Sequence, residues 1–140
     1  MAQGFKYVYN DYGKDPTRIT EFLMTDGEAG SAGEAVKLVA GRWTKAGATD
    51  PIAAFLTTNV VAGTDKEAEV ILAREGDWYE APYSGTAAAG FTPGASGIAL
   101  ASDGLSANSA TVTGGSLAVL AINENKKTAR FKVKNRQLPN

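Results

Sequence analysis

The sequence predicts a mainly β fold: a small β-barrel or β-tulip-like domain with long loops, and a second small β block at the C-terminus. Three observations lead to this prediction. The chain has 16 Gly residues and is rich in Ala, Ser and Thr, which is typical of turn-rich β proteins. Its apolar runs are short and are separated by turn residues. Residues 128–134 alternate strictly between apolar and basic side chains, with the period of a strand.

Length and composition limit the classes of function. The chain has 140 residues, 44% hydrophobic content, 21% charged content and a formal net charge of −1, which indicate one folded globular domain whose charge selects no partner. It has no Cys and no His, which argues against zinc sites of the usual kind, Cys nucleophiles, Ser-His-Asp triads and disulfides. No apolar run is long enough to span a membrane and no signal-peptide core is present, so we expect a protein made in the cytosol.

The predicted organisation has three segments that pack as a single domain. Residues 1–15 form an N-terminal arm, residues 16–97 a β domain, and residues 98–140 a C-terminal block of strands. In the arm, Phe5, Tyr7 and Tyr9 alternate with other residues, so an extended backbone would place the three rings on one face. Two interpretations stay open: a strand that lays its rings on the protein's own core, or an arm that docks on another chain.

The segment before the centre of the chain contains a short element and a hairpin. Residues 18–25 fit either a helix after Asp15-Pro16 or a strand, and we favour the strand. The Gly-rich loop at residues 26–33 lacks the features of a phosphate-binding loop or a calcium loop. Residues 34–46 predict a β-hairpin that turns at Gly41. Its Trp43, between two cations, is either a stacking platform for a sugar or base, or a partly buried side chain covered by their stems.

The chain is organised around residues 52–83, where two apolar runs, 52–61 and 69–73, are joined by turn residues and followed by Trp78-Tyr79. We interpret this stretch as a β-hairpin with a short aromatic return strand, although Thr64 to Glu67 also has the form of a helix capping box. Residues 84–97 form a long loop. We expect core positions at Leu72, Trp78 and Leu120, which lie in the most apolar strands.

The C-terminal block carries a basic strand. Ala129, Phe131 and Val133 are expected on one face and a row of cations on the other. The three aligned cations are Arg130, Lys132 and Lys134. They are either simply solvated or meet an acidic partner surface.

No catalytic machinery is predicted. The acids clustered at residues 65–69 and 75–80 include Asp77 and are interpreted as solvated turn charges, since neighbouring strand residues point to opposite faces. No dinucleotide fingerprint is present. We therefore expect no enzyme activity, no catalytic residue, no metal and no cofactor.

The stretch AAFLTTNVVAG, the strand EVILA and the following REGDWYE resemble the capsid decoration, or cement, proteins of tailed bacteriophages, the class of the lambda head-stabilising protein. The preceding GEAVKLVAGRWTKAG is similar to the same class. The resemblance covers residues 34–83 well and the rest loosely.

The resemblance implies a β-rich protein that binds the outer surface of the expanded head as a homotrimer, with the major capsid protein as partner and an N-terminal arm that orders on the capsid. It also implies binding at the local three-fold sites of the head and a place in the virion. We expect no membrane partner and no nucleic-acid partner. The candidate partner-binding residues are Phe5, Tyr7, Tyr9, Arg130, Lys132 and Lys134. Two other classes stay open: a tail, baseplate or carbohydrate-binding protein that uses Trp43 and Trp78, and a small barrel that binds single-stranded nucleic acid through the basic strand.

Overall fold

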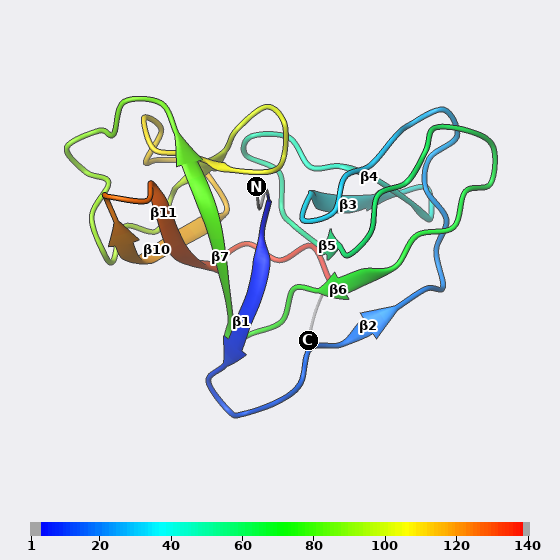
Figure 1. The fold of residues 1–140 in the computed structure, drawn as a ribbon, viewed down its shortest axis with the longest axis horizontal. Coiled ribbons are helices and arrows are strands. Elements are labelled where there is room, and N and C mark those ends of the chain that lie inside the picture. The colour runs from blue at the N-terminus through cyan, green and yellow to red at the C-terminus, as the bar shows by residue number, and fades with distance from the viewer. Residues whose placement is uncertain (1–3, 139–140) are drawn as a thin grey trace.

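The computed structural model describes residues 4–138, and this part of the chain contains strands and no helix. The prediction of a mainly β fold is confirmed: one sheet is curled into a half-barrel and a second, smaller sheet lies beside it (Figure 1). The strands are β1 (Lys6–Asn10), β2 (Arg18–Ile19), β3 (Ala35–Val39), β4 (Arg42–Lys45), β5 (Ala54–Leu56), β6 (Val70–Leu72), β7 (Asp77–Ser84), β8 (Ala99–Leu100), β9 (Ala107–Asn108), β10 (Leu117–Asn123) and β11 (Thr128–Val133).

The first sheet has the strand order β10-β11-β7-β9-β8, and β1 also pairs with β7. The second sheet has the order β2-β6-β5-β3-β4. All pairings between these strands are antiparallel except β7 with β9. In Figure 1 the two sheets form two lobes, with β7 and β11 in one and β3 to β6 in the other.

The predicted three segments do not follow the sheets. β1 from residues 1–15, β7 from residues 16–97 and β11 from residues 98–140 are neighbours in the first sheet, with β7 in the middle. The central strand β7 buries every second side chain, so its backbone N–H and C=O groups need hydrogen-bond partners on both edges of the strand. Sequence distance does not limit such antiparallel pairing, which is why the segment boundaries are crossed.

Aromatic rings from both sheets meet in the core. Phe5 of the N-terminal segment lies 4.9 Å from Phe55 and 6.1 Å from Phe131, and Phe55 lies 4.4 Å from Tyr79, between ring centroids. All four side chains are buried. Such ring contacts add to the free energy gained by burial, so they hold the two sheets together as one core.

A second cluster of buried residues lies inside the smaller sheet around Trp43. Trp43 has an exposed fraction of 0%, and the ring of Phe22 packs edge-on against it at 5.7 Å. The interpretation of Trp43 as a stacking platform for a ligand is therefore wrong. The alternative interpretation was a partly buried Trp43 covered by the stems of the neighbouring cations, and the side chain is buried more completely than that.

The predicted hairpins are confirmed, with shorter strands. β3 and β4 pair around a two-residue turn in which Ala40 and Gly41 both have positive φ, 52° and 79°, as the tight hairpin turn with matching twist requires. β5 and β6 pair as the predicted central hairpin, but residues 57–69 form a long loop between them. The predicted short aromatic return strand is wrong: it is the eight-residue β7, which belongs to the other sheet. The helical alternatives at Thr64 to Glu67 and at residues 18–25 are not formed, and in the second region only Arg18–Ile19 is a strand.

Two of the three predicted core residues, Trp78 and Leu120, do not point into the core and are half-buried. The third, Leu72, is also half-buried but packs against the cluster around Trp43. In β7 the alternation places Tyr79 inward and its neighbour Trp78 outward. In β10 the pairing with β11 shifts between Val119 and Ala121, so Leu120 occupies the bulge instead of an inward position.

Two leucines of β10 test this assignment directly. Leu117→Ala, at a fully buried position, is expected to lower the free energy of unfolding by about 2–5 kcal/mol through lost burial and the cavity left behind. Leu120→Ala, in the bulge, is expected to cost about 1 kcal/mol. Urea denaturation of the two variants measures the difference, and equal losses would contradict the inward and outward positions assigned here.

Candidate binding surface on the outer face of the first sheet

The structure gathers three of the six predicted partner-binding residues on the outer face of the first sheet. Tyr9 of β1 stands opposite Trp78 of β7, and Arg130 of β11 stands opposite Glu80 of β7. Lys132 lies two residues beyond Arg130 and therefore points to the same side. Because β1, β7 and β11 are adjacent, side chains from residues 9, 78, 130 and 132 share one surface.

A β-bulge in β1 turns the Tyr9 side chain toward the outer face of the first sheet. The register between β1 and β7 shifts between Tyr7 and Tyr9, so Tyr7 is opposite the inward Tyr79 while Tyr9 is opposite the outward Trp78. Phe5 is 4% exposed and belongs to the core. The prediction that these three rings share one face is therefore wrong, because the extra residue in β1 reverses the alternation.

The first two rings of the N-terminal segment face the chain's own interior. Tyr7 packs edge-on against Tyr79 with centroids 6.0 Å apart, and its hydroxyl donates a hydrogen bond of 2.7 Å to the Lys14 carbonyl. Burial raises the pKa of Tyr7, so the hydroxyl remains a donor. Phe5 and Tyr7 also line a cleft of about 350 Å³ that runs between β1 and the second sheet, with Phe55 and Ile71 on the far wall.

The outer residues form a compact group that we call the aromatic–cation face: Tyr9, Trp78, Arg130 and Lys132. The two ring centroids are 5.2 Å apart, with an interplanar angle of 41°. The Arg130 Cζ lies 5.9 Å from the Tyr9 ring centroid and the Lys132 Nζ lies 5.3 Å from that of Trp78. Tyr9 is 44% exposed, so the face presents aromatic surface to a partner.

Both cations of the face are paired with acids of the same chain. The Arg130 Nε lies 3.3 Å from the Glu80 Oε1, and Lys132 forms a short ion pair with Asp11. Asp11 also accepts a hydrogen bond of 2.7 Å from the Trp78 indole nitrogen. The hydrogen bonds from Lys132 and then Trp78 lower the pKa of Asp11, so these charges balance at neutral pH.

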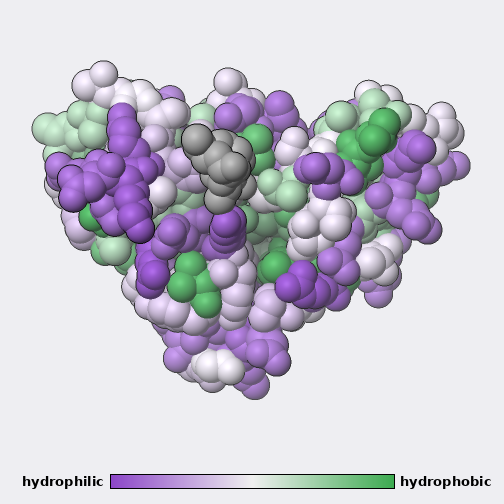
Figure 2. Space-filling model, viewed as in Figure 1, coloured by the Kyte–Doolittle hydropathy of each residue, from purple (hydrophilic) through white to green (hydrophobic). Residues whose placement is uncertain are grey.

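The basic strand is confirmed over Thr128–Val133, one residue shorter than predicted, with two of the three predicted cations on it. Ala129, Phe131 and Val133 are buried, and Arg130 and Lys132 point outward. Lys134 lies past the end of β11, is exposed, and stands outside the aromatic–cation face. Figure 2 shows hydrophilic surface gathered over the lobe that contains β7, β10 and β11.

A buried charge network beneath β7 was missed by the sequence analysis. Asp77 has an exposed fraction of 0%, so its interpretation as a solvated turn charge is wrong. Arg74 holds it through two side-chain contacts: Nη2 to Oδ1 at 3.0 Å and Nε to Oδ2 at 3.1 Å. Asn10 of β1 donates a further hydrogen bond of 2.8 Å to Oδ1. The sequence could have indicated this burial, because Asp77 lies two residues before Tyr79 in the same strand and therefore points to the same, inward face.

This network connects segments that are distant in the sequence. The Arg74 Nη1 donates to the Thr17 hydroxyl at 3.0 Å, and the Tyr79 hydroxyl lies 3.2 Å from the Asp77 Oδ2. Burial, followed by the neighbouring Asp77 charge, raises the pKa of Tyr79, so its hydroxyl stays protonated. Asp77 is enclosed by hydrogen-bond donors from β1, from β7 and from the turn before β7, and these bonds join the two strands at one end.

Within residues 4–138, no group of three or more acidic side chains is placed to hold a metal ion, and no helix is long and apolar enough to cross a membrane.

Comparison with known proteins adds no relative. No protein family, no curated protein and no solved structure matched this chain. The fold and the outer face define an all-β domain with an exposed aromatic and cationic sheet surface.

Proposed function

We propose that this chain is a non-enzymatic structural protein that binds the outer surface of a bacteriophage head and stabilises the expanded capsid. The observation that carries the proposal is the ring pair of the exposed Tyr9 and the half-buried Trp78 on the outer face of the sheet, flanked by Arg130 and Lys132. The resemblance of residues 34–83 to phage decoration proteins supplies the partner, the major capsid protein.

The chemistry of the face suits a protein partner. Tyr, Trp and Arg are enriched at protein interfaces and dominate their binding energies. The four side chains stand on three paired strands and contact one another, so little conformational entropy is lost when a partner orders them. Their charges are already neutralised within the chain, which lowers the cost of excluding water from the contact.

The same features weigh against the two alternative functions. A carbohydrate-binding surface built on both tryptophans lacks Trp43, which is buried in the second sheet. A surface for single-stranded nucleic acid needs an excess of positive charge along a groove, whereas Arg130 and Lys132 each face an acid.

A homotrimer at the three-fold sites of the head is the assembly that the resemblance implies, and it places the protein in the virion. Sedimentation of the free protein and of decorated heads measures its stoichiometry. If the protein is a monomer both in solution and on heads, the homotrimer is excluded.

Substitution of Tyr9 tests the docking face. Tyr9→Ala is expected to weaken binding to undecorated expanded heads by at least about tenfold, which is 1.4 kcal/mol, because an aromatic anchor is lost from the contact. The melting temperature of the free protein should change little, since Tyr9 is 44% exposed. Occupancy on heads of the phage that encodes the chain, measured over a concentration series, gives the result.

The matched control is Val61→Ala, which removes an exposed apolar side chain from the loop between β5 and β6. It should bind like the wild type. Unchanged occupancy for Tyr9→Ala would exclude this face as the docking surface. A salt-dependent complex with a single-stranded oligonucleotide, lost on neutralising Arg130, would favour the nucleic-acid alternative.

A further inference from the structure

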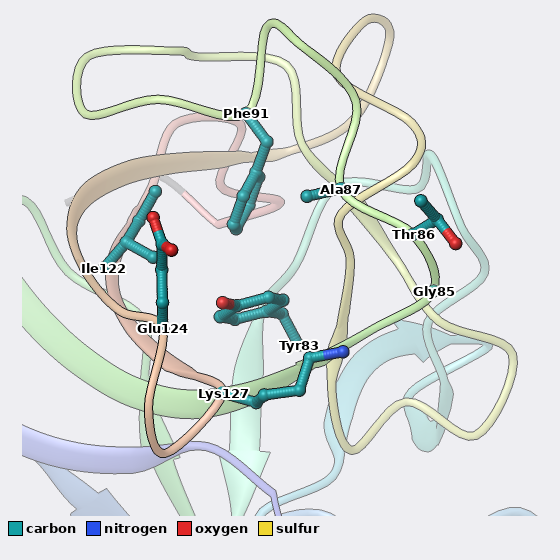
Figure 3. Close-up of a pocket in the computed structure, with 8 residues that line it drawn as sticks. All are labelled: Tyr83, Gly85, Thr86, Ala87, Phe91, Ile122, Glu124 and Lys127. Atoms are coloured by element: carbon teal, nitrogen blue, oxygen red, sulfur yellow. The ribbon is translucent and has the colours of Figure 1, made fainter.

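Glu34, the residue before β3, is a buried carboxylate with few partners. It is 4% exposed, and its Oε1 accepts a hydrogen bond of 3.3 Å from the Ser31 N–H. Within residues 4–138, its Oε2 has no hydrogen-bond partner and the side chain forms no ion pair. By contrast, Glu124 at the edge of the cavity drawn in Figure 3 is exposed, so water solvates its charge. A charge on Glu34 lacks such solvation and is therefore costly to bury.

The loop between β8 and β9 covers this carboxylate. We call residues 101–106 the cover loop. Gly104, inside the loop, lies so close that a Cβ atom added to it would be 3.1 Å from the Glu34 Cγ. The Gly104 carbonyl accepts a hydrogen bond of 2.9 Å from the N–H of Ala35, the first residue of β3. In Figure 1 the cover loop is the yellow segment between the two lobes. A loop of the first sheet thus closes over the start of the second.

The cover loop keeps its own shape and is only lightly attached to the second sheet. The Ala101 N–H donates to the Ser106 carbonyl at 2.9 Å, which closes the loop at its base. In the described part of the chain, two hydrogen bonds join the loop to the second sheet. One is the backbone bond to β3 just described, and the other is a long bond of 3.4 Å from the Lys45 ammonium to the Ser102 carbonyl. Few bonds therefore have to break for the loop to lift away as a unit.

The groups around Glu34 favour its neutral form while the loop is closed. Burial raises the pKa of Glu34, and the Ser31 hydrogen bond and the Lys45 charge offset this only in part. Glu28, from the loop before β3, and Asp103, from the cover loop itself, are like charges that raise the pKa further. Lifting the loop would admit water to the carboxylate and move Asp103 away from it.

We propose that the cover loop is a pH-sensitive lid between the two sheets, closed over Glu34 when this residue is protonated and opened when it ionises. A neutral carboxyl group stays under the loop at a small cost, whereas an ionised one gains water and distance from Asp103 when the loop lifts. The chain has no His, the side chain that usually senses pH between about 5 and 8. The lid does not depend on the proposed binding to phage heads.

The direction of the pH effect follows from the raised pKa. Glu34 holds its proton more tightly in the closed fold than in the open or unfolded chain. Its contribution to stability is therefore complete below the ordinary pKa of Glu, 4.5, and is lost as the pH rises through the raised value. Asp11 and Asp50, whose pKa values are lowered by hydrogen bonds from lysines, act in the opposite sense at lower pH. Measurements above about pH 5 avoid their range.

Hydrogen exchange of the full chain, followed by NMR, tests the lid. The Ala35 N–H reports opening, because its acceptor is the Gly104 carbonyl. The Leu56 N–H, which donates to the Glu34 carbonyl within the second sheet, is the reference. After correction for intrinsic rates, Ala35 is expected to exchange at least about tenfold faster than Leu56, since the loop opens without global unfolding. The opening equilibrium at Ala35 should rise by at least about threefold between pH 5 and pH 7.5.

Three variants assign this rise to the buried carboxylate. Glu34→Gln keeps the shape of the side chain and removes its ionisation, so opening at Ala35 should become independent of pH. Asp103→Asn keeps the oxygen that accepts the Leu105 N–H and removes the repulsion, so the rise should be smaller than in the wild type. Glu67→Gln, at an exposed position between β5 and β6, is the matched control and should behave like the wild type.

Several results would overturn the proposal. Opening at Ala35 that does not change with pH in the wild type is one, and an equal rise in Glu34→Gln is another. Equal opening equilibria at Ala35 and Leu56 would show that the loop is released only when the whole chain unfolds. A ¹³C NMR titration of the Glu34 carboxyl with a midpoint at the ordinary value of Glu would show that solvent reaches it in the closed fold.

Discussion

Deletion of residues 1–12 is expected to abolish cooperative folding. The deletion removes β1, which pairs with β7, and exposes the core around Phe55, Tyr79 and Phe131 that Phe5 covers. Loss of a buried Phe alone costs about 3–5 kcal/mol, and a domain of this size is stabilised by only about 5–15 kcal/mol. Far-ultraviolet circular dichroism during heating measures the transition.

Phe5→Ala and Tyr9→Ala separate the contributions of this segment. Phe5→Ala should lower the free energy of unfolding by about 3–5 kcal/mol, because the side chain is buried. Tyr9→Ala should lower the free energy of unfolding only slightly. A free docking arm predicts the opposite for the deletion: an unchanged melting curve with loss of head binding. A truncated protein that melts like the full chain would therefore show that β1 is not part of the stable fold.

Asp77→Asn is expected to be the most damaging single polar substitution. It leaves Arg74 without its charged partner in a site where Asp77 is 0% exposed, and breaking such a buried pair costs about 3–5 kcal/mol. The new amide nitrogen would also be placed among the donors of Arg74 and Asn10. Urea denaturation at neutral pH measures the loss.

Glu80→Gln is the matched control for this prediction. It breaks the Arg130 pair on the exposed face, which is expected to cost about 0–1 kcal/mol. A double-mutant cycle with Arg74→Met and Asp77→Asn should show that the double variant loses less than the sum of the single ones. If Asp77→Asn is no more harmful than Glu80→Gln, the buried network does not stabilise the fold.

Local patterns predicted some elements well. In β11 the strict alternation around Phe131 indicated both the strand and its buried face. The Gly41 turn indicated the β3–β4 hairpin, because a positive φ is needed there and Gly adopts it without strain. In both cases the information lies within a few residues of the chain.

Other positions depended on partners that are distant in the sequence. The inward or outward direction of Tyr9 and the position of Leu120 follow from bulges in the pairing of β1 with β7 and of β10 with β11. The burial of Asp77 required Asn10 and Arg74 as neighbours. A carboxylate can be removed from water only where such donors converge, and composition does not reveal where they do.

The sequence by itself determined the β class, the hairpins, the buried face of β11 and the supply of aromatic and basic side chains. Only the tertiary structure decided which of them meet: Tyr9, Trp78, Arg130 and Lys132 on one surface, and Phe5 in the core. The physical reason is that strand alternation is a local property of the backbone. Sheet order, register and bulges are set by burial across the whole chain.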